Sequence, residues 1–108
     1  MNKVLLDENL PVKLKYRLQN ICEIYTVSDK GWNALENGDL IAAMEKDGFN
    51  YLITSDKNLQ YQQNLGKYSI GFIILNVRNN NYETILPLIE KIKIALAGKG
   101  GPKLIIIE

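Results

Sequence analysis

The stretch from Tyr51 to Lys57 constrains the fold of this chain more than any other, because it changes abruptly from apolar to polar. It begins with the apolar run Tyr51-Leu52-Ile53 and ends with Thr54-Ser55-Asp56-Lys57. A short apolar run that follows a glycine turn is typical of a strand buried in a parallel sheet. Ligands of open α/β sheets bind at the carboxyl ends of the strands, so we expect Asp56 to lie at the rim of a binding crevice.

The same pattern occurs near the N-terminus, where Lys3-Val4-Leu5-Leu6 leads directly into Asp7-Glu8-Asn9. Two strands that each end in an acid predict one shared acidic site. Asp7 and Asp56 can meet only if the first and third strands are neighbours in the sheet. That requirement predicts the strand order 2-1-3-4-5, in which the switch point lies between strands one and three.

Further along the chain, strands and helices are expected to alternate. Strand-like runs at residues 22–27, 70–75 and 104–107 are separated by helical patterns at 10–21, 40–46 and 85–97. This alternation predicts one α/β domain spanning residues 1–108, with a mostly parallel sheet in a three-layer α/β/α sandwich. The last strand follows the glycine-rich segment 98–102, so it could pair either parallel or antiparallel at the sheet edge.

Two expected helix starts follow from capping residues. Asn9 is a suitable N-cap for the first helix, and Asp39 is expected to open the second. Leu10, Leu14, Leu18 and Ile21 recur at helical spacing and are expected to face the core.

Two apolar features bear on binding. Trp32 lies in the polar loop 28–38, where it could stack on a nucleic-acid base, although folding back onto the core is the favoured expectation. In the last helix, Leu88 and Ile94 lie off the stripe formed by Ile85, Ile89, Ile92 and Leu96. An exposed apolar patch there predicts a homodimer or a complex with a small partner protein.

The composition removes several classes of chemistry. The chain has no histidine and a single cysteine, Cys22, which excludes Ser-His-Asp and Cys-His catalysis, histidine-rich zinc sites and an internal disulfide. The net charge is +1, but residues 1–60 carry 7 basic and 9 acidic side chains, whereas residues 61–108 carry 6 and 3. Because no apolar run approaches the length of a membrane span and no signal peptide follows Met1, we expect a cytoplasmic protein.

Three aspartates, Asp7, Asp39 and Asp56, each lie where a strand or loop is expected to lead into a helix at one edge of the sheet. Like charges gathered together raise one another's pKa, and a divalent cation removes that cost. Oxygen ligands of this kind suit Mg²⁺ or Mn²⁺. A bound cation of this type activates water toward a phosphate without any histidine, so the pattern predicts metal-dependent phosphodiester hydrolysis.

Four segments of the chain resemble the PIN-like domains, in particular the small bacterial group of that family. They are Leu5-Leu6-Asp7-Glu8-Asn9-Leu10-Pro11, Gly38-Asp39-Leu40-Ile41, Leu52-Ile53-Thr54-Ser55-Asp56-Lys57 and Gly71-Phe72-Ile73-Ile74-Leu75. The resemblance covers roughly residues 3 to 76. It implies a PIN-like sandwich, a metal-dependent ribonuclease ancestry and the toxin role of a toxin–antitoxin pair, with a small antitoxin protein as partner.

The acidic positions of that family correspond here to Asp7, Asp39 and Asp56, with Glu8 as a further acid. The family usually has Asp-Lys-Asp-Phe where this chain has Asp56-Lys57-Asn58-Leu59. Asn58 can still offer its carbonyl oxygen to a metal, but it brings no charge.

In the ribonuclease hypothesis, the three aspartates hold the cation and act in catalysis. Lys57 contacts the phosphate of a single-stranded or tRNA-like substrate, and Thr54 or Ser55 orients water or backbone. Two alternatives stay open. One is a PIN-like module that only binds RNA or a protein, which Asn58 favours. The other is a phosphoacceptor receiver, which would use Asp7, Glu8 and Asp56 but also needs a hydroxyl at the end of strand four and a lysine at the end of strand five. The chain has Leu75-Asn76-Val77 and an early Lys103 instead.

Overall fold

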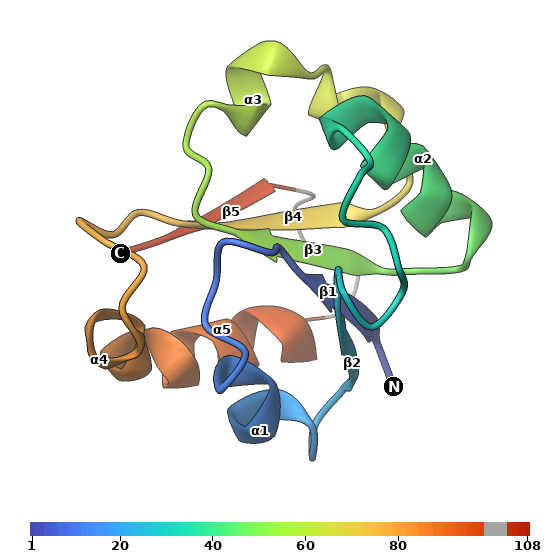
Figure 1. The fold of residues 1–108 in the computed structure, drawn as a ribbon. Coiled ribbons are helices and arrows are strands. Elements are labelled where there is room, and N and C mark those ends of the chain that lie inside the picture. The colour runs from blue at the N-terminus through green and yellow to red at the C-terminus, as the bar shows by residue number, and fades with distance from the viewer. Residues whose placement is uncertain (99–103) are drawn as a thin grey trace.

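A single sheet of five parallel strands forms the centre of the computed structural model, which describes residues 1–98 and 104–108 (Figure 1). The strand order is β2-β1-β3-β4-β5, as predicted. The bounds are Lys3–Leu6 for β1, Glu23–Thr26 for β2, Tyr51–Thr54 for β3, Gly71–Leu75 for β4 and Leu104–Ile107 for β5. Strand β5 pairs parallel with β4, from Phe72 opposite Leu104 to Leu75 opposite Ile107, so the antiparallel alternative for the last strand is wrong.

Helices cover both faces of the sheet and complete the three-layer sandwich (Figure 1). Helix α1 (Leu14–Leu18), α4 (Tyr82–Ile85) and α5 (Ile89–Ala97) lie on one face. Helix α2 (Asn37–Lys46) and α3 (Leu59–Gln62) lie on the other. Two 3₁₀ turns, η1 (Leu65–Lys67) and η2 (Leu86–Leu88), complete the described elements. No helix in the described ranges has the length and apolar character needed to cross a bilayer.

The sheet separates two cores because successive strand residues point to opposite faces. Val4, Leu6 and Ile53 pack against α1 and α5, whereas Leu5 and Leu52 pack on the side of α2. All five side chains are at most 2% exposed. Burial on both faces explains why the strands are nearly continuous apolar runs.

The first helix is shorter than predicted. Helix α1 begins at Leu14, after a stretch of turns, so Asn9 is not its N-cap. Leu10, Leu14 and Leu18 are buried as expected, but Ile21 lies beyond the helix and is 36% exposed. The helical spacing ends at Leu18, and Cys22 fills the core position that Ile21 was expected to take.

The second helix begins earlier than predicted. Its first residue is Asn37, and Glu36 is the N-cap, so Asp39 lies within the first turn and does not open the helix. A carboxylate in the first turn still interacts favourably with the positive end of the helix dipole.

The C-terminal helical segment keeps the predicted buried stripe of Ile85, Ile89, Ile92 and Leu96. Its N-cap is Asn81, and the 3₁₀ turn containing Pro87 joins α4 to α5. Leu88 is half-buried against the core, so the predicted patch is wrong at that position, whereas Ile94 is 72% exposed. Helix α5 ends before Gly98, and the rest of the glycine-rich segment lies outside the described residues.

The exposed side chain of Ile94 lies beside Ile21 and not, as was predicted, beside an exposed Leu88. Together with Ile21, Lys93, Leu96 and Ala97 it lines a surface hollow of about 290 Å³. The partner prediction therefore concerns a smaller surface, between the end of α1 and α5.

Gly71 is required by a close approach between neighbouring strands. It pairs with Tyr51 across β3 and β4, and a Cβ atom at position 71 would lie 2.5 Å from Cε1 of the tyrosine ring. We therefore expect Gly71→Ala to lower the free energy of unfolding by about 1–3 kcal/mol through overpacking. Urea denaturation measures this change.

The companion variant is Tyr51→Ala, which removes the ring. In the Tyr51→Ala background, Gly71→Ala should lower the free energy of unfolding much less than in the wild-type background, because the effects of substitutions at contacting residues are not additive. Equal costs in the two backgrounds would show that Tyr51 is not the reason for the glycine.

Candidate functional site

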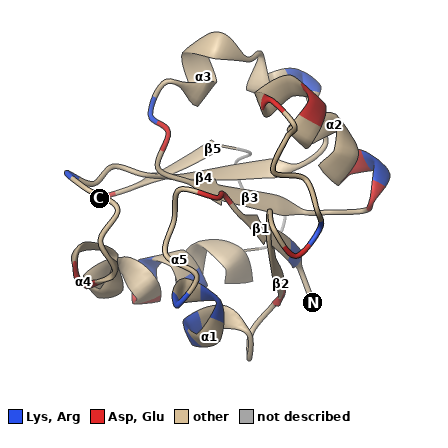
Figure 2. Ribbon diagram, viewed as in Figure 1, with Lys and Arg blue, Asp and Glu red and all other residues tan. Residues whose placement is uncertain are grey.

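The two acids that the sequence places after strands lie at the same edge of the sheet. β1 pairs with β3, with Leu6 opposite Ile53, and the backbone N–H of Asp7 continues the pairing by donating to the Ile53 carbonyl at 3.0 Å. Acidic residues accordingly follow both strands where the chain leaves the sheet (Figure 2). The predicted neighbourhood of Asp7 and Asp56 is thus a consequence of the strand order.

Thr54 connects the two acids. Its side chain is fully buried, and its Oγ1 donates to Oδ2 of Asp7 at 2.7 Å. The same Oγ1 accepts the backbone N–H of Asp56 at 3.0 Å. The last residue of β3 thereby fixes one oxygen of Asp7 and the backbone of Asp56 with a single hydroxyl group.

The electrostatics of Asp7 differ from those of a surface aspartate. Burial raises the pKa of Asp7 above its usual value, and the nearby charges of Glu8 and Asp56 raise it further. The hydrogen bonds from the Thr54 hydroxyl and the Glu8 backbone N–H lower the pKa in part. Asp7 is therefore a carboxylate that a nearby positive charge would stabilise.

The segment after Asp56 presents polar groups to solvent. Oδ1 of Asp56 accepts the backbone N–H of Asn58 at 3.0 Å, which closes a tight turn before α3. Lys57 and Asn58 are exposed, and Ser55 is half-buried. Asn58 is the N-cap residue of α3, but its side chain makes no capping hydrogen bond. The hydrogen bonds of this turn therefore use the backbone of Asn58 and not its side-chain amide.

The loop between β2 and α2 also reaches this edge. Nδ2 of Asn33 donates to Oε2 of Glu8 at 3.2 Å and to Oγ of Ser28 at 3.0 Å. The sequence argument did not single out Asn33, because the polar composition of residues 28–38 predicts a loop without showing where that loop lies. Its link to Glu8 orients an acid that adjoins Asp7.

Asp39 is placed differently from the other two aspartates. It is exposed on the first turn of α2, and the charges that shift the pKa of Asp7 come from Glu8 and Asp56. Among residues 1–98 and 104–108, no group of three or more Asp, Glu, His or Cys side chains has a spacing suited to holding a metal ion. The structure brings Asp7, Thr54 and Asp56 together with Glu8, and a ligand role for Asp39 stays a prediction.

A polar hollow adjoins the start of α2. It has a volume of about 410 Å³ and is lined by Glu36, Asn37, Gly38, Gln62 and Gln63, from the start of α2 and the end of α3. Its walls offer amide donors and acceptors. One of its lining residues, Gly38, directly precedes Asp39 in the chain. The surface between α2 and α3 is therefore polar.

The receiver alternative shares this strand order, so the order alone does not separate it from a PIN-like protein. A receiver needs a hydroxyl at the end of β4, but β4 ends at Leu75 and Asn76 follows, with its amide bonded to Glu108. The buried hydroxyl is on β3, at Thr54. A receiver also needs a lysine at the end of the fifth strand, and Lys103, the lysine near that strand, lies outside the described residues.

Comparison with family models, with curated proteins and with solved structures finds no match to this chain.

Because the charge of Asp56 raises the pKa of Asp7, we expect Asp56→Asn to lower that pKa. The substitution removes the charge but keeps an oxygen that can accept the Asn58 N–H. Asp39→Asn is the matched control and should leave the pKa of Asp7 unchanged. Carbon-13 NMR titration of the aspartate carboxyls measures both, and an equal decrease in the two variants would place Asp39 in the same cluster.

The same shift has a consequence for stability. The raised pKa means that, between the usual aspartate value and its own, Asp7 binds more protons in the folded state than in the unfolded chain. Stability should therefore decrease as the pH rises through this window. Asp56→Asn should flatten that decrease in urea titrations at successive pH values.

Proposed function

We propose that this chain is a metal-dependent ribonuclease, a phosphodiesterase in which Asp7 and Asp56 hold the cation. The observation that supports this most is the half-buried carboxylate of Asp7, which the Thr54 hydroxyl holds at 2.7 Å and whose pKa is raised by burial and by the charges of Glu8 and Asp56. Carboxylates with shifted pKa values cluster at active sites, so the environment of Asp7 marks this edge as a candidate site. The buried Thr54 hydroxyl that holds Asp7 in place adds a positioned support for the acid.

The donor groups at this edge are of the chemical type that a hard divalent cation takes. Asp7, Asp56 and Glu8 offer carboxylate oxygens, and Asn58 offers an amide oxygen, which are ligands of the kind that Mg²⁺ and Mn²⁺ take. Asp39 is a further candidate ligand. When bound, such a cation supplies polarisation of a phosphoryl oxygen and activation of water.

The remaining residues of this edge have separate roles in the proposal. Thr54 keeps one oxygen of Asp7 occupied, so the carboxylate is held in one orientation. The exposed ammonium of Lys57 contacts the substrate phosphate beside Asp56, and Ser55 orients water or backbone. None of these roles needs histidine, which the chain lacks.

A single-stranded or tRNA-like RNA is the proposed substrate, because a flexible strand reaches an open sheet edge more easily than a rigid duplex. The resemblance to small PIN-like proteins adds the role of a cytoplasmic toxin with a small antitoxin partner. The exposed surface around Ile94 and Ile21 supports such a partner, or a second copy of the chain, as the group that covers it.

A second candidate is a module that binds RNA or a protein without cleaving it. One observation favours it: Asn58 stands where the family pattern has an acid. Cation binding and RNA cleavage separate the two candidates.

Mg²⁺ or Mn²⁺ should raise the melting temperature of the wild-type protein, because a ligand that binds only the folded state stabilises it by RT ln(1 + [L]/Kd). A free cation concentration 100 times Kd corresponds to an increase of roughly 10 °C for a chain of this size. Differential scanning calorimetry measures it. Asp56→Asn should remove most of the increase, whereas the control Glu90→Gln, an exposed acid on α5, should retain it. Identical melting in cation and in chelator for the wild type would rule out this cation site.

Cleavage of a labelled single-stranded RNA should be weak in the wild type and stronger with Mn²⁺ than with Mg²⁺, since Mg²⁺ demands near-ideal octahedral geometry. Asn58→Asp restores one negative charge and should increase the rate at limiting Mg²⁺. Asp7→Asn should eliminate cleavage. Gel analysis over a metal series measures all three, and inert wild-type and Asn58→Asp proteins in Mn²⁺ would leave only the binding module.

A further inference from the structure

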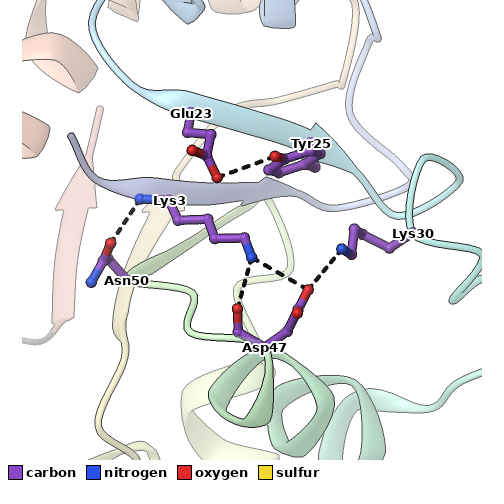
Figure 3. Close-up of polar contacts among 6 residues, drawn as sticks. All are labelled: Lys3, Glu23, Tyr25, Lys30, Asp47 and Asn50. Carbon is purple, nitrogen blue, oxygen red and sulfur yellow. Dashed lines mark hydrogen bonds and ion pairs between the residues drawn. The ribbon is translucent and has the colours of Figure 1, made fainter.

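A second cluster of charged side chains lies where β1 begins and α2 ends (Figure 3). Asp47, the residue after α2, pairs through Oδ2 with Nζ of Lys30 at 2.7 Å and with Nζ of Lys3 at 3.4 Å. Lys3 also donates to the backbone carbonyl of Asp47 at 2.7 Å. Hydrogen bonding from Lys30 lowers the pKa of Asp47, and the pKa of Lys30 is raised in turn, so this pair stays charged at neutral pH.

Three aromatic rings surround the Lys30 ammonium. Its Nζ lies 5.2 Å from the ring centre of Tyr25, 5.5 Å from that of Trp32 and 5.8 Å from that of Phe49. Trp32 also packs on Phe49, with the ring centres 5.7 Å apart. The expectation that Trp32 folds back onto the core is therefore confirmed, and Trp32 lies at the edge of that core, half-buried.

The exposed part of Trp32 forms a wall of a surface hollow. The hollow has a volume of about 470 Å³ and is lined by Lys30, Trp32, Ala43, Lys46 and Asp47. An indole ring and two ammonium groups thus lie around one concave surface, and the small side chain of Ala43 leaves its floor open.

The charge of this hollow is positive. Of its lining residues two are lysines and one is an aspartate. Lys30 pairs with that aspartate at 2.7 Å, and Lys3 adds a further positive charge 3.4 Å from the same carboxylate oxygen. Glu23 does not line the hollow, and its Oε2 accepts a hydrogen bond from the Tyr25 hydroxyl at 3.1 Å. Lys46 is exposed at the last position of α2. An anion entering the hollow therefore meets two ammonium groups and an aromatic surface.

We infer that this hollow binds one nucleotide of a single-stranded RNA, with its base stacked on Trp32 and its phosphate between Lys30 and Lys46. Aromatic platforms beside cationic side chains are the usual means of binding single strands, and stacking is tolerant of sequence. A bare phosphate would use the lysines but would leave the indole without a role.

The site extends the proposed function and rests on it only for the identity of the strand as RNA. The acids lie at the carboxyl ends of the strands and the hollow lies toward the amino ends. Asn33, the residue after Trp32, contacts Glu8 beside Asp7, so one loop connects the hollow with the acids. One RNA strand can therefore occupy the hollow while another part of it lies at Asp7 and Asp56.

The chain contains one tryptophan, so its fluorescence reports directly on the hollow. The experiment is a titration of the full chain with hexa-adenylate in the presence of EDTA, which prevents metal-dependent cleavage. We expect Trp32 fluorescence to be quenched. In Lys46→Ala the affinity should decrease at least fivefold, and the slope of log Kobs against log salt should fall by about 0.7, the value for one phosphate contact on a single strand. Lys91→Ala, on α5 at the opposite face, is the matched control and should bind as the wild type does.

A second measurement tests the indole itself. The anisotropy of a labelled hexa-adenylate should show at least fivefold weaker binding to Trp32→Leu, while Trp32→Phe keeps an aromatic platform and should bind with an intermediate affinity. Because Trp32 packs on Phe49, the leucine variant could lose its fold, but Lys46 is exposed and belongs to neither core, so Lys46→Ala tests the site independently.

Three outcomes would overturn the inference: no quenching at millimolar hexa-adenylate, equal quenching by inorganic phosphate, or unchanged affinity in Lys46→Ala. The catalytic proposal fails separately. If the wild type cleaves no RNA in Mn²⁺ but hexa-adenylate still quenches Trp32, the ribonuclease assignment is wrong and the nucleotide site stands.

Discussion

The pairing of β1 with β3 at the centre of the sheet is the contact on which the arrangement of this protein depends. It joins two strands that are separated in sequence by a helix, a strand and a further helix, and it buries both faces of each strand. Parallel neighbours have their carboxyl ends at the same edge, so this pairing places Asp7 next to Thr54 and Asp56. With another strand order the same residues would lie on separate parts of the surface.

Asp7 and Asp47 show how position in such a sheet determines the state of a carboxylate. At the carboxyl edge, burial and two neighbouring acids raise the pKa of Asp7, and only hydrogen bonds oppose that effect. Near the amino edge, two lysines pair with Asp47 and its pKa is lowered. The first arrangement costs stability and suits a cation, whereas the second ties the end of α2 to β1 and to the loop that follows β2. The acids around Asp7 thus make the first site suitable for a cation, and the lysines around Asp47 make the second suitable for the anionic phosphate of a nucleotide.

Much of the fold could be predicted because its determinants are local. Apolar runs such as Ile70–Leu75 identify buried strands, and the helical spacing of Ile85, Ile89, Ile92 and Leu96 identifies a buried face. The errors fall where local patterns compete with packing. Ile21 continues the spacing of Leu14 and Leu18, but the helix ends at Leu18 and Cys22 occupies the core instead. Asp39 resembles an N-cap, but α2 begins two residues earlier. Leu88 lies off the stripe of an ideal helix, yet the 3₁₀ turn at Pro87 changes its direction and half-buries it.

The sequence by itself determined the element types and the identity of the acids at the strand ends, because hydrophobic periodicity and the chemistry of strand termini are properties of short segments. The strand order was predicted from the requirement that Asp7 and Asp56 meet, and the long-range pairing of β1 with β3 fulfils it. Only the tertiary structure decided which polar groups meet. The hydrogen bond from Thr54 to Asp7 joins residues 47 positions apart, and the contact of Asn33 with Glu8 spans 25. The aromatic surroundings of Lys30 come from β2, from the loop after it and from Phe49, two residues before β3. Contacts of this kind depend on how whole layers pack, and no local pattern of residues encodes that packing.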